Sequence, residues 1–262
     1  MGPGDRYRHR YGALDGQEGD LWLPAEPHPP VLCLLHGGFW RMPYGREQMD
    51  ALARDLAGRG FAVWNLEYRR IGAPGTDGRD ILADVAAGIG HLAALAARGA
   101  DLDLDRVLLI GHSAGGQLAL WAGARQRVDP APGVRVAGVA GLAPLADLAR
   151  AHALDAGADA IAAFLGGAPR DQPARCAQAS PMALVPLGLP HLIVHGDADT
   201  MVPVALSREY VQAARQAGDP VDYRELPGVG HMELIVPGGP AHAALCAWLD
   251  RTAPGGPVQC VG

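Results

Sequence analysis

The sequence Gly-His-Ser-Ala-Gly at residues 111–115 directly follows an apolar run at residues 106–110. This placement predicts a buried strand that turns sharply into a helix, with Ser113 at the turn. Because glycine has no side chain, Gly111 and Gly115 let strand and helix approach closely while the serine adopts a strained backbone conformation. The chain holds 36 glycines, so the motif alone is weak, but its context is typical of a nucleophile elbow. We predict that Ser113 is a nucleophile.

Two further strand-like runs end in residues that suit a serine nucleophile. Residues 191–195 lead into a loop that contains Asp197 and Asp199, and residues 221–226 lead into a loop that contains His231. A serine hydroxyl needs a base to accept its proton, and the base needs a carboxylate to hold its tautomer. The order serine, acid, histidine is the one that α/β-hydrolases use. We predict that the acid is Asp199, with Asp197 as the competing candidate.

A glycine-rich loop follows the fully apolar run at residues 31–35 and reads His36-Gly-Gly-Phe-Trp40. Acyl transfer needs backbone N–H groups aimed at the developing oxyanion, and glycines allow such a loop to approach the substrate. His36 is expected to support the loop by hydrogen bonding rather than to act as a second base. The predicted oxyanion-hole residues are Gly37, which shapes the turn, and the donors Gly38, Phe39 and Ala114.

Two side chains next to the predicted site are candidates for contact with substrate. Trp40 follows the oxyanion loop, and His112 precedes the nucleophile. We assign both to substrate binding. The alternatives are that Trp40 is an ordinary core aromatic residue and that His112 makes a structural hydrogen bond.

Apolar runs and helical patterns alternate along the chain, which predicts one α/β domain over residues 1–262. A mostly parallel sheet with helices on both faces would bring all these motifs to the carboxyl ends of its strands. Residues 145–188 interrupt the alternation and are expected to form a small cap, and residues 253–262 a flexible tail. The predicted strands are 31–35, 61–66, 106–110, 135–142, 191–195 and 221–226, and the predicted helices 46–57, 80–97, 115–125, 204–217 and 240–251.

Composition narrows the possible functions. A net charge of −6 without a basic cluster argues against nucleic acid or an anionic membrane as partner. All 22 basic residues are arginine, which excludes chemistry that depends on lysine. No apolar run approaches the 20 or so residues of a membrane span, and no secretory signal is visible, so we expect a cytoplasmic protein. The cysteines at 33, 176, 246 and 260 lack zinc-ligand spacing and are expected to be free thiols.

We expect no metal and no cofactor. Residues 101–105 begin like a calcium loop, but Arg106 stands where the glycine is required and His112 where the glutamate belongs. The expected partner is a small-molecule ester or amide substrate. The chain is expected to be a monomer or a homodimer.

The chain resembles the kynurenine formamidase-like branch of the α/β-hydrolases and its carboxylesterase neighbours. The resemblance is carried by the oxyanion loop, residues 67–70 (Glu-Tyr-Arg-Arg), residues 111–116, the Asp199 loop and His231. The resemblance spans residues 21–249. It implies a cofactor-free serine hydrolase that cleaves aryl formamides or small acyl esters through an acyl-enzyme, and it favours Asp199, three residues before Val202-Pro203, as the acid. Phe39 stands where the formamidases often carry tyrosine. An acyltransferase or cyclising thioesterase, and a ligand-binding receptor on the same fold, remain alternatives.

Overall fold

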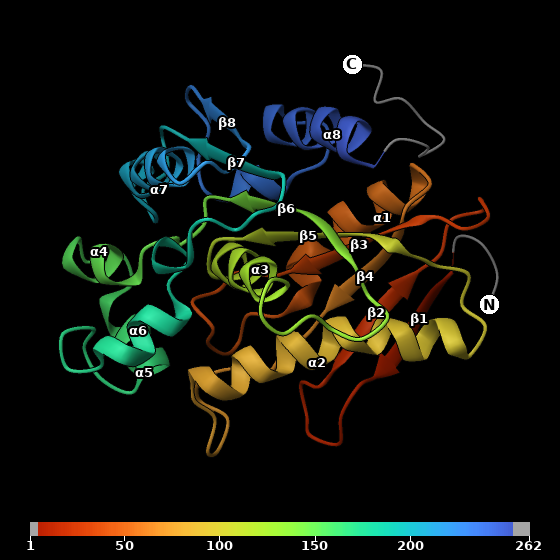
Figure 1. Cartoon of the computed structure of the whole chain (residues 1–262), viewed down its shortest axis with the longest axis horizontal. Coiled ribbons are helices and arrows are strands. Elements are labelled where there is room, and N and C mark those ends of the chain that lie inside the picture. The colour runs from red at the N-terminus through yellow and green to blue at the C-terminus, as the bar shows by residue number, and fades with distance from the viewer. Residues whose placement is uncertain (1–4, 254–262) are drawn as a thin grey trace.

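An eight-stranded sheet runs through the centre of the molecule in the computed structural model, which describes residues 5–253 (Figure 1). Its strand order is β1-β2-β4-β3-β5-β6-β7-β8. The pairings of β1 with β2 and of β2 with β4 are antiparallel, and the other pairings are parallel. This confirms the predicted mostly parallel sheet and α/β-hydrolase fold. The strands are β1 (Arg6–Arg10), β2 (Glu18–Trp22), β3 (Pro30–Leu35), β4 (Ala62–Leu66), β5 (Asp103–His112), β6 (Val136–Leu142), β7 (His191–Gly196) and β8 (Val221–Leu226).

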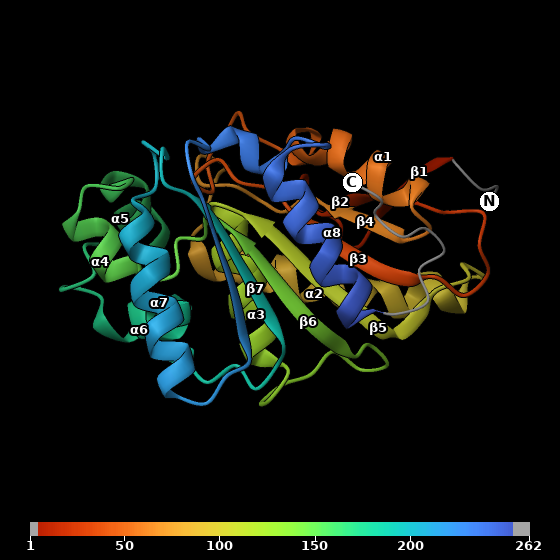
Figure 2. The same ribbon diagram turned by 90° about the horizontal axis from the view of Figure 1, so that it is seen from above.

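Helices cover both faces of the sheet, as Figure 2 shows. One hydrophobic cluster lies between the sheet and α2, α3 and α7, and a second lies between the sheet and α1 and α8. The predicted helix 46–57 is divided into a 3₁₀ turn, η1 (Arg46–Met49), and α1. The covering helices are α1 (Asp50–Gly58), α2 (Gly78–Ala97), α3 (Ala114–Arg125), α7 (Val204–Gln216) and α8 (Pro240–Thr252).

The central strands are apolar throughout because both of their faces are buried. In β3, Cys33 and Leu35 belong to the first cluster and Leu32 and Leu34 to the second. Successive side chains of a strand point to opposite faces, so a strand covered on both sides needs a continuous apolar run. This is why residues 31–35 and 106–110 could be recognised in the sequence.

The strands β1 and β2 were not predicted. β1 has the sequence Arg-Tyr-Arg-His-Arg and lies at the sheet edge, where its residues alternate between exposed and half-buried. A strand without an apolar face gives no hydrophobic period to detect. Ion pairs hold this edge, since Arg8 and Arg6 both contact the buried carboxylate of Asp20 on β2.

Residues 145–188 form a group of short helices at one end of the molecule (Figures 1 and 2). The interruption of the strand–helix alternation that the sequence predicted is therefore present. Its helices are α4 (Leu148–Ala153), α5 (Ala158–Leu165), α6 (Pro173–Ala179) and the 3₁₀ turn η2 (Pro181–Leu184).

Contrary to the sequence prediction, α2 is long and apolar enough to span a membrane by length and composition alone. The sequence of α2 is rich in alanine, which raises its mean hydropathy without forming a wide face of large apolar side chains. Its large apolar residues, among them Ile81, Val85 and Leu92, are buried in the core cluster against the sheet. The composition of α2 is thus consistent with a core helix.

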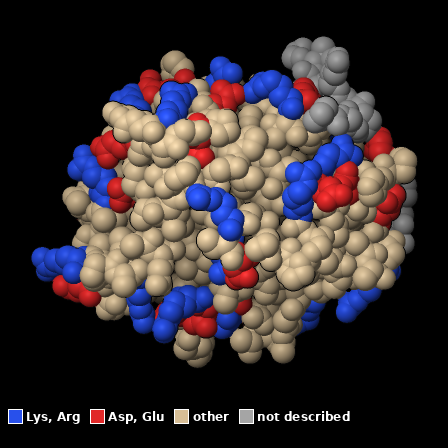
Figure 3. All heavy atoms as spheres, viewed as in Figure 1, with Lys and Arg blue, Asp and Glu red and all other residues tan. Residues whose placement is uncertain are grey.

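Arginines and carboxylates are interspersed on the face seen in Figure 3 rather than gathered by sign. Cys33, Cys176 and Cys246 are buried free thiols, as predicted. Cys260 and residues 254–262 of the predicted tail lie outside the described residues.

A candidate active site at the carboxyl edge of the sheet

Ser113 lies at the sharp turn between β5 and α3, with backbone angles φ 56° and ψ −119°. A non-glycine residue in this region costs on the order of 1–3 kcal/mol and persists only where its surroundings enforce it. A Cβ on Gly111 would stand 2.0 Å from the carbonyl oxygen of Gly115, and a Cβ on Gly115 would stand 2.1 Å from that of Leu35. The backbone N–H of Ser113 donates to Leu142 of β6 over 2.8 Å. The predicted elbow geometry is therefore present, and both glycines are required for it.

Asp199 and His231 are in direct contact at the same edge. The His231 Nδ1 atom lies 2.6 Å from Asp199 Oδ2, and the Asp199 side chain is completely buried. The other carboxylate oxygen, Oδ1, accepts the backbone N–H groups of Met201 and Val202 over 2.8 and 2.9 Å. The geometry pairs the histidine with the acid that the sequence analysis preferred.

Asp197, the competing acid, has a different partner. Its Oδ1 accepts the backbone N–H of Gly228 over 2.6 Å, and its side chain is exposed. This bond ties the loop after β7 to the loop after β8, which carries His231. Asp197 is therefore placed to order the two loops.

Hydrogen bonds determine the charge of the buried Asp199. Burial alone would raise the pKa of this carboxyl, but hydrogen bonds from His195, His231 and the backbone of Val202 hold the pKa well below its usual range. Asp199 is therefore a carboxylate throughout the neutral range.

His112 is buried against His231. The two rings lie 4.5 Å apart, and His112 Nε2 lies 3.1 Å from the backbone oxygen of His231. Burial, together with the neighbouring charge of His231, lowers the pKa of His112 to about 3. The imidazole is neutral and holds the backbone of His231, so the alternative of a structural hydrogen bond describes it better than substrate binding.

The Ser113 hydroxyl makes no hydrogen bond to the His231 imidazole within the described part of the chain. Catalytic hydrogen bonds in unliganded hydrolases are often long and tighten only when substrate binds. Ser113 directly follows His112, whose ring lies 4.5 Å from that of His231.

The loop after β3 packs directly on the elbow. A Cβ on Gly37 would lie 3.1 Å from the Ser113 Cβ, and a Cβ on Gly38 would lie 2.3 Å from the Tyr44 Cβ. Gly38, Phe39 and Trp40 have φ values of 100°, 52° and 57°, so three consecutive residues adopt left-handed backbone conformations. Such a run turns successive N–H groups away from the regular sheet direction.

The predicted oxyanion-hole donors have no competing acceptors. Among residues 5–253, neither Gly38 nor Phe39 donates its backbone N–H to another group. Ala114 is the first residue of α3, where N–H groups have no partner inside the helix. The assignment of these three N–H groups to an oxyanion hole stays a prediction.

His36 supports this loop from beneath, as predicted. Its Nε2 lies 2.7 Å from Glu67 Oε1, and its ring stacks on Tyr68 with centroids 4.3 Å apart. The Tyr68 hydroxyl donates to the His36 carbonyl over 2.7 Å. Neither ring nitrogen of His36 is directed at Ser113, because Nδ1 contacts the Gly37 carbonyl oxygen and Nε2 contacts Glu67.

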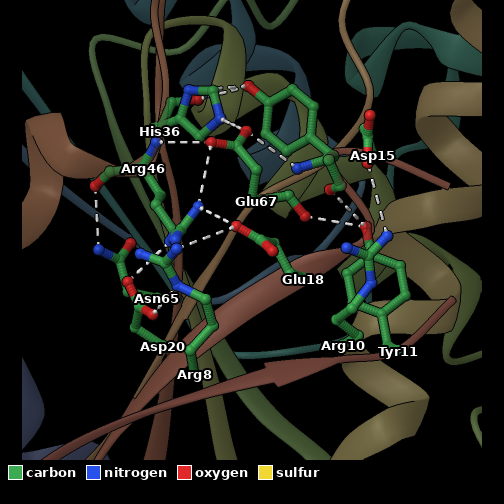
Figure 4. Close-up of polar contacts among 12 residues, drawn as sticks. Arg8, Arg10, Tyr11, Asp15, Glu18, Asp20, His36, Arg46, Asn65 and Glu67 are labelled. Carbon is green, nitrogen blue, oxygen red and sulfur yellow. Dashed lines mark hydrogen bonds and ion pairs between the residues drawn. The ribbon is translucent and has the colours of Figure 1, made fainter. Parts of the chain in front are cut away.

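A network of charged residues extends from His36 to the antiparallel edge of the sheet (Figure 4). Glu67 accepts the backbone N–H of Arg46 over 3.1 Å, and the Arg46 guanidinium contacts Asp20 and Glu18 over 2.7 and 3.1 Å. Burial raises the pKa of Glu67, but the His36 hydrogen bond and the positive charges nearby bring it below its usual value. Sequence reasoning missed this support because it missed β2.

The structure does not bring Trp40 to a substrate cavity, so the assignment of Trp40 to substrate binding needs correction. The side chain is fully buried, its Nε1–H donates to Gln117 Oε1 over 3.1 Å, and its ring stacks on Phe164 at 4.5 Å. Trp40 joins the oxyanion loop to α3 and α5 as a core aromatic residue, which was the alternative interpretation.

Phe39 lines a cavity of about 400 Å³ between the oxyanion loop and the turn that joins α4 to α5. A Cβ on Gly157 would lie 2.3 Å from the Phe39 ring, so the turn packs directly on this side chain. The cavity is lined by Gly38, Phe39, Arg41, Met42, Tyr44, Asp155, Gly157, Ala158, Asp159 and Ala160.

His195, which sequence analysis treated only as the end of a strand, also belongs to this site. Its Nε2 lies 3.2 Å from Asp199 Oδ2 and 2.9 Å from the Val202 carbonyl oxygen. Because His195 lies within an apolar run, sequence analysis did not predict that it contacts the acid. A histidine four residues before the acid, at the end of a buried strand, was the available signal.

Comparison with known proteins gives a consistent result. A model of the BD-FAE family matches residues 20–213. Esterase LipC of Mycobacterium tuberculosis is 28% identical over 94% of this chain and 66% of its own length, and Esterase LipQ of the same organism is 30% identical over 81% and 53%. The chain thus spans less than two thirds of the length of these relatives.

Solved structures show the same fold. Esterase B from Lactobacillus rhamnosis superimposes with a TM-score of 0.77 at 25% identity, covering 96% of this chain and 86% of the esterase. The thermophilic esterase Est2 from Thermogutta terrifontis gives a TM-score of 0.74 at 21% identity, covering 96% and 95%.

Proposed function

The chain belongs to the BD-FAE family, and on that premise we propose that it is a serine esterase that hydrolyses small acyl esters through an acyl-enzyme. The observation that carries the proposal is the 2.6 Å contact between His231 and the buried Asp199, beside a serine in an elbow conformation. The names of the relatives, all esterases, agree with it.

In the first half of the proposed reaction, His231 Nε2 accepts the Ser113 proton as Ser113 Oγ attacks the carbonyl carbon of the ester. The carbonyl oxygen becomes an oxyanion that accepts hydrogen bonds from the N–H groups of Gly38, Phe39 and Ala114. The tetrahedral intermediate then breaks its bond to the alcohol oxygen, which takes the proton from His231. The acyl group remains on Ser113.

In the second half, water replaces the alcohol. His231 accepts a proton from the water as its oxygen attacks the acyl carbon, and the oxyanion hole acts again. Collapse of this intermediate breaks the bond to Ser113 Oγ, which recovers its proton from His231, and releases the carboxylic acid. Asp199 stays ionised throughout and stabilises the imidazolium that forms twice.

We further propose that residues 145–188 act as a cap and that part of the substrate occupies the cavity beside Phe39. The direct packing of the α4–α5 turn on Phe39 supports this assignment. A volume of about 400 Å³ suits a small substrate group.

Hydrolysis of an aryl formamide is a second candidate for the same groups. The Phe39 ring in the wall of the cavity favours it, since an aromatic wall suits an aryl substituent. The reaction differs only in that the amine leaves in place of the alcohol.

Steady-state rates with short-chain p-nitrophenyl esters and with N-formylkynurenine test the proposal. We expect turnover of the esters by the wild-type protein and none by Ser113→Ala with its fold retained. A markedly faster rate on the formyl amide would select the second candidate. Ester turnover that persists in Ser113→Ala would contradict the mechanism.

A further inference from the structure

We propose that His195, held in place by Ser207, is a positioning residue for the carboxylate of Asp199. The chain of polar contacts from His231 to Asp199 then extends to His195 and Ser207. The inference rests on the proposed function, because it assigns a role within the same site. His195 and Ser207 are both completely buried, at the end of β7 and in α7.

The partners of His195 determine which of its nitrogens carries a proton. Nε2 faces two acceptors, the Val202 carbonyl oxygen at 2.9 Å and Asp199 Oδ2 at 3.2 Å. Neither acceptor has a hydrogen to give, so Nε2 must be the donor. In a ring that carries its one proton on Nε2, Nδ1 is an acceptor, and the Ser207 hydroxyl, 2.7 Å away, donates to it.

This arrangement gives each carboxylate oxygen of Asp199 two polar neighbours. Oδ1 accepts two backbone N–H groups, and Oδ2 accepts the N–H of His231 and also lies 3.2 Å from His195 Nε2, which bonds the Val202 carbonyl oxygen. A carboxylate with two partners on each oxygen is fixed in rotation, so Oδ2 stays aimed at His231 Nδ1. Removing His195 would leave Oδ2 with a single partner and free the carboxylate to turn.

The same nitrogen also fixes the backbone that carries the acid. Because His195 Nε2 contacts the Val202 carbonyl, and the Val202 N–H donates to Asp199, the loop is held at both peptide groups that flank Val202. Hydrogen bonds that orient a reacting group are worth more in catalysis than in stability, since small displacements of the base are costly.

The chain offers a matched control at His242 on α8. His242 is also buried, and its Nε2 lies 2.6 Å from Asp55 Oδ2, but it packs against α1 on the other side of the sheet. A substitution there removes a similar histidine–carboxylate bond without touching the site.

The experiment compares His195→Leu, His195→Gln, Ser207→Ala and His242→Leu with the wild-type protein, each checked for folding by circular dichroism and Tm. We expect His195→Leu to lower kcat for p-nitrophenyl acetate about tenfold, with little change in KM. The amide of His195→Gln restores a donor near the position of Nε2, so this variant should recover most of kcat. His242→Leu should lower Tm and leave kcat unchanged.

A second readout does not depend on turnover. The proton between His231 Nδ1 and Asp199 Oδ2 should give a low-field NMR resonance that is absent in Asp199→Asn. We expect His195→Leu to broaden or shift this resonance, Ser207→Ala to do so more weakly, and His242→Leu to leave it unchanged.

A folded His195→Leu that keeps kcat within twofold and keeps the resonance would overturn the inference, as would a His195→Gln as defective as the leucine variant. If His195→Leu does not fold, an unchanged kcat and resonance in Ser207→Ala would overturn it. Failure of the proposed function is separate, because it shows as no ester turnover by the wild-type protein itself.

Discussion

The two sides of the candidate site are held by different chemistry. On the oxyanion side, His36 and Glu67 connect the loop to a buried cluster of arginine and carboxylates at the antiparallel edge of the sheet. On the acid–base side, the carboxylate of Asp199 is surrounded by histidines and backbone N–H groups, and that of Asp197 accepts the N–H of Gly228. One side is fixed by ion pairs across elements, and the other by hydrogen bonds within and between two loops.

This difference separates stability from catalysis. Removing one member of a buried ion pair leaves an uncompensated charge and is strongly destabilising. Removing one hydrogen bond to Asp199 leaves the sheet and its clusters intact and alters the aim of the base. We therefore expect changes on the oxyanion side to affect folding and rate together, and changes on the acid–base side to affect mainly the rate.

The largest effect is expected from Asp199→Asn. The amide can stay buried but favours the wrong tautomer of His231, so kcat should fall about 10⁴-fold with little change in KM. The matched control is Asp197→Asn, which alters an exposed carboxylate two residues away and should change kcat by no more than a few fold. Equal losses in the two variants would reverse the assignment of the acid.

Gly38→Ala should have the next largest effect, on the oxyanion side. The added Cβ would meet Tyr44 at 2.3 Å and would sit at a φ of +100°, so the loop must shift. We expect a loss of roughly 100-fold in kcat, the scale of one oxyanion donor. The control is Gly72→Ala, because Gly72 has a similar φ of +106° but open space around it. The difference between the two variants separates the effect of the steric clash from that of backbone strain.

Glu67→Gln tests whether the two sides differ in stability. Loss of the carboxylate removes the ionic partner of His36 and Arg46, so we expect the free energy of unfolding to fall by about 3 kcal/mol and kcat by about tenfold. Glu47→Gln, at an exposed position nearby, serves as the control. A Glu67→Gln protein as stable as the wild type would show that the oxyanion side does not depend on ion pairs for its stability.

The last effect concerns stability at acid pH and the buried His112. Burial beside His231 lowers the pKa of His112 to about 3, whereas the unfolded chain titrates near about 6.5. Between these values the unfolded state binds a proton that the folded state does not. Stability should therefore decrease as the pH falls from about 6.5 towards 3, by up to about 1.4 kcal/mol per pH unit from this group.

Denaturant unfolding at pH 7 and pH 4 measures this contribution. In His112→Gln, whose amide can still reach the His231 carbonyl, the loss on acidification should be smaller than in the wild type. Identical losses in both proteins would show that His112 is protonated in the folded state.

The motifs could be predicted because each one is local. The elbow needs two glycines within five residues of a buried strand. The acid follows β7, which is buried on both faces, and the histidine follows the half-buried edge strand β8. The antiparallel edge could not be predicted, since β1 and β2 are held by ion pairs to partners far along the chain. The roles of Trp40 and His195 could not be predicted either, because their partners lie on helices distant in the sequence. Trp40 contacts α3 and α5, and His195 contacts α7. Location in the cytoplasm and oligomeric state stay predictions.

The most direct test of the account is intact-mass analysis after treatment with a fluorophosphonate, in wild-type protein, Ser113→Ala and Asp199→Asn. The central claim is that Ser113 is a nucleophile activated through His231 and Asp199. It predicts one covalent adduct on the wild type, none on Ser113→Ala, and a greatly slowed adduct on Asp199→Asn. Labelling of Ser113→Ala, or a wild-type protein that stays unlabelled while folded, would contradict it.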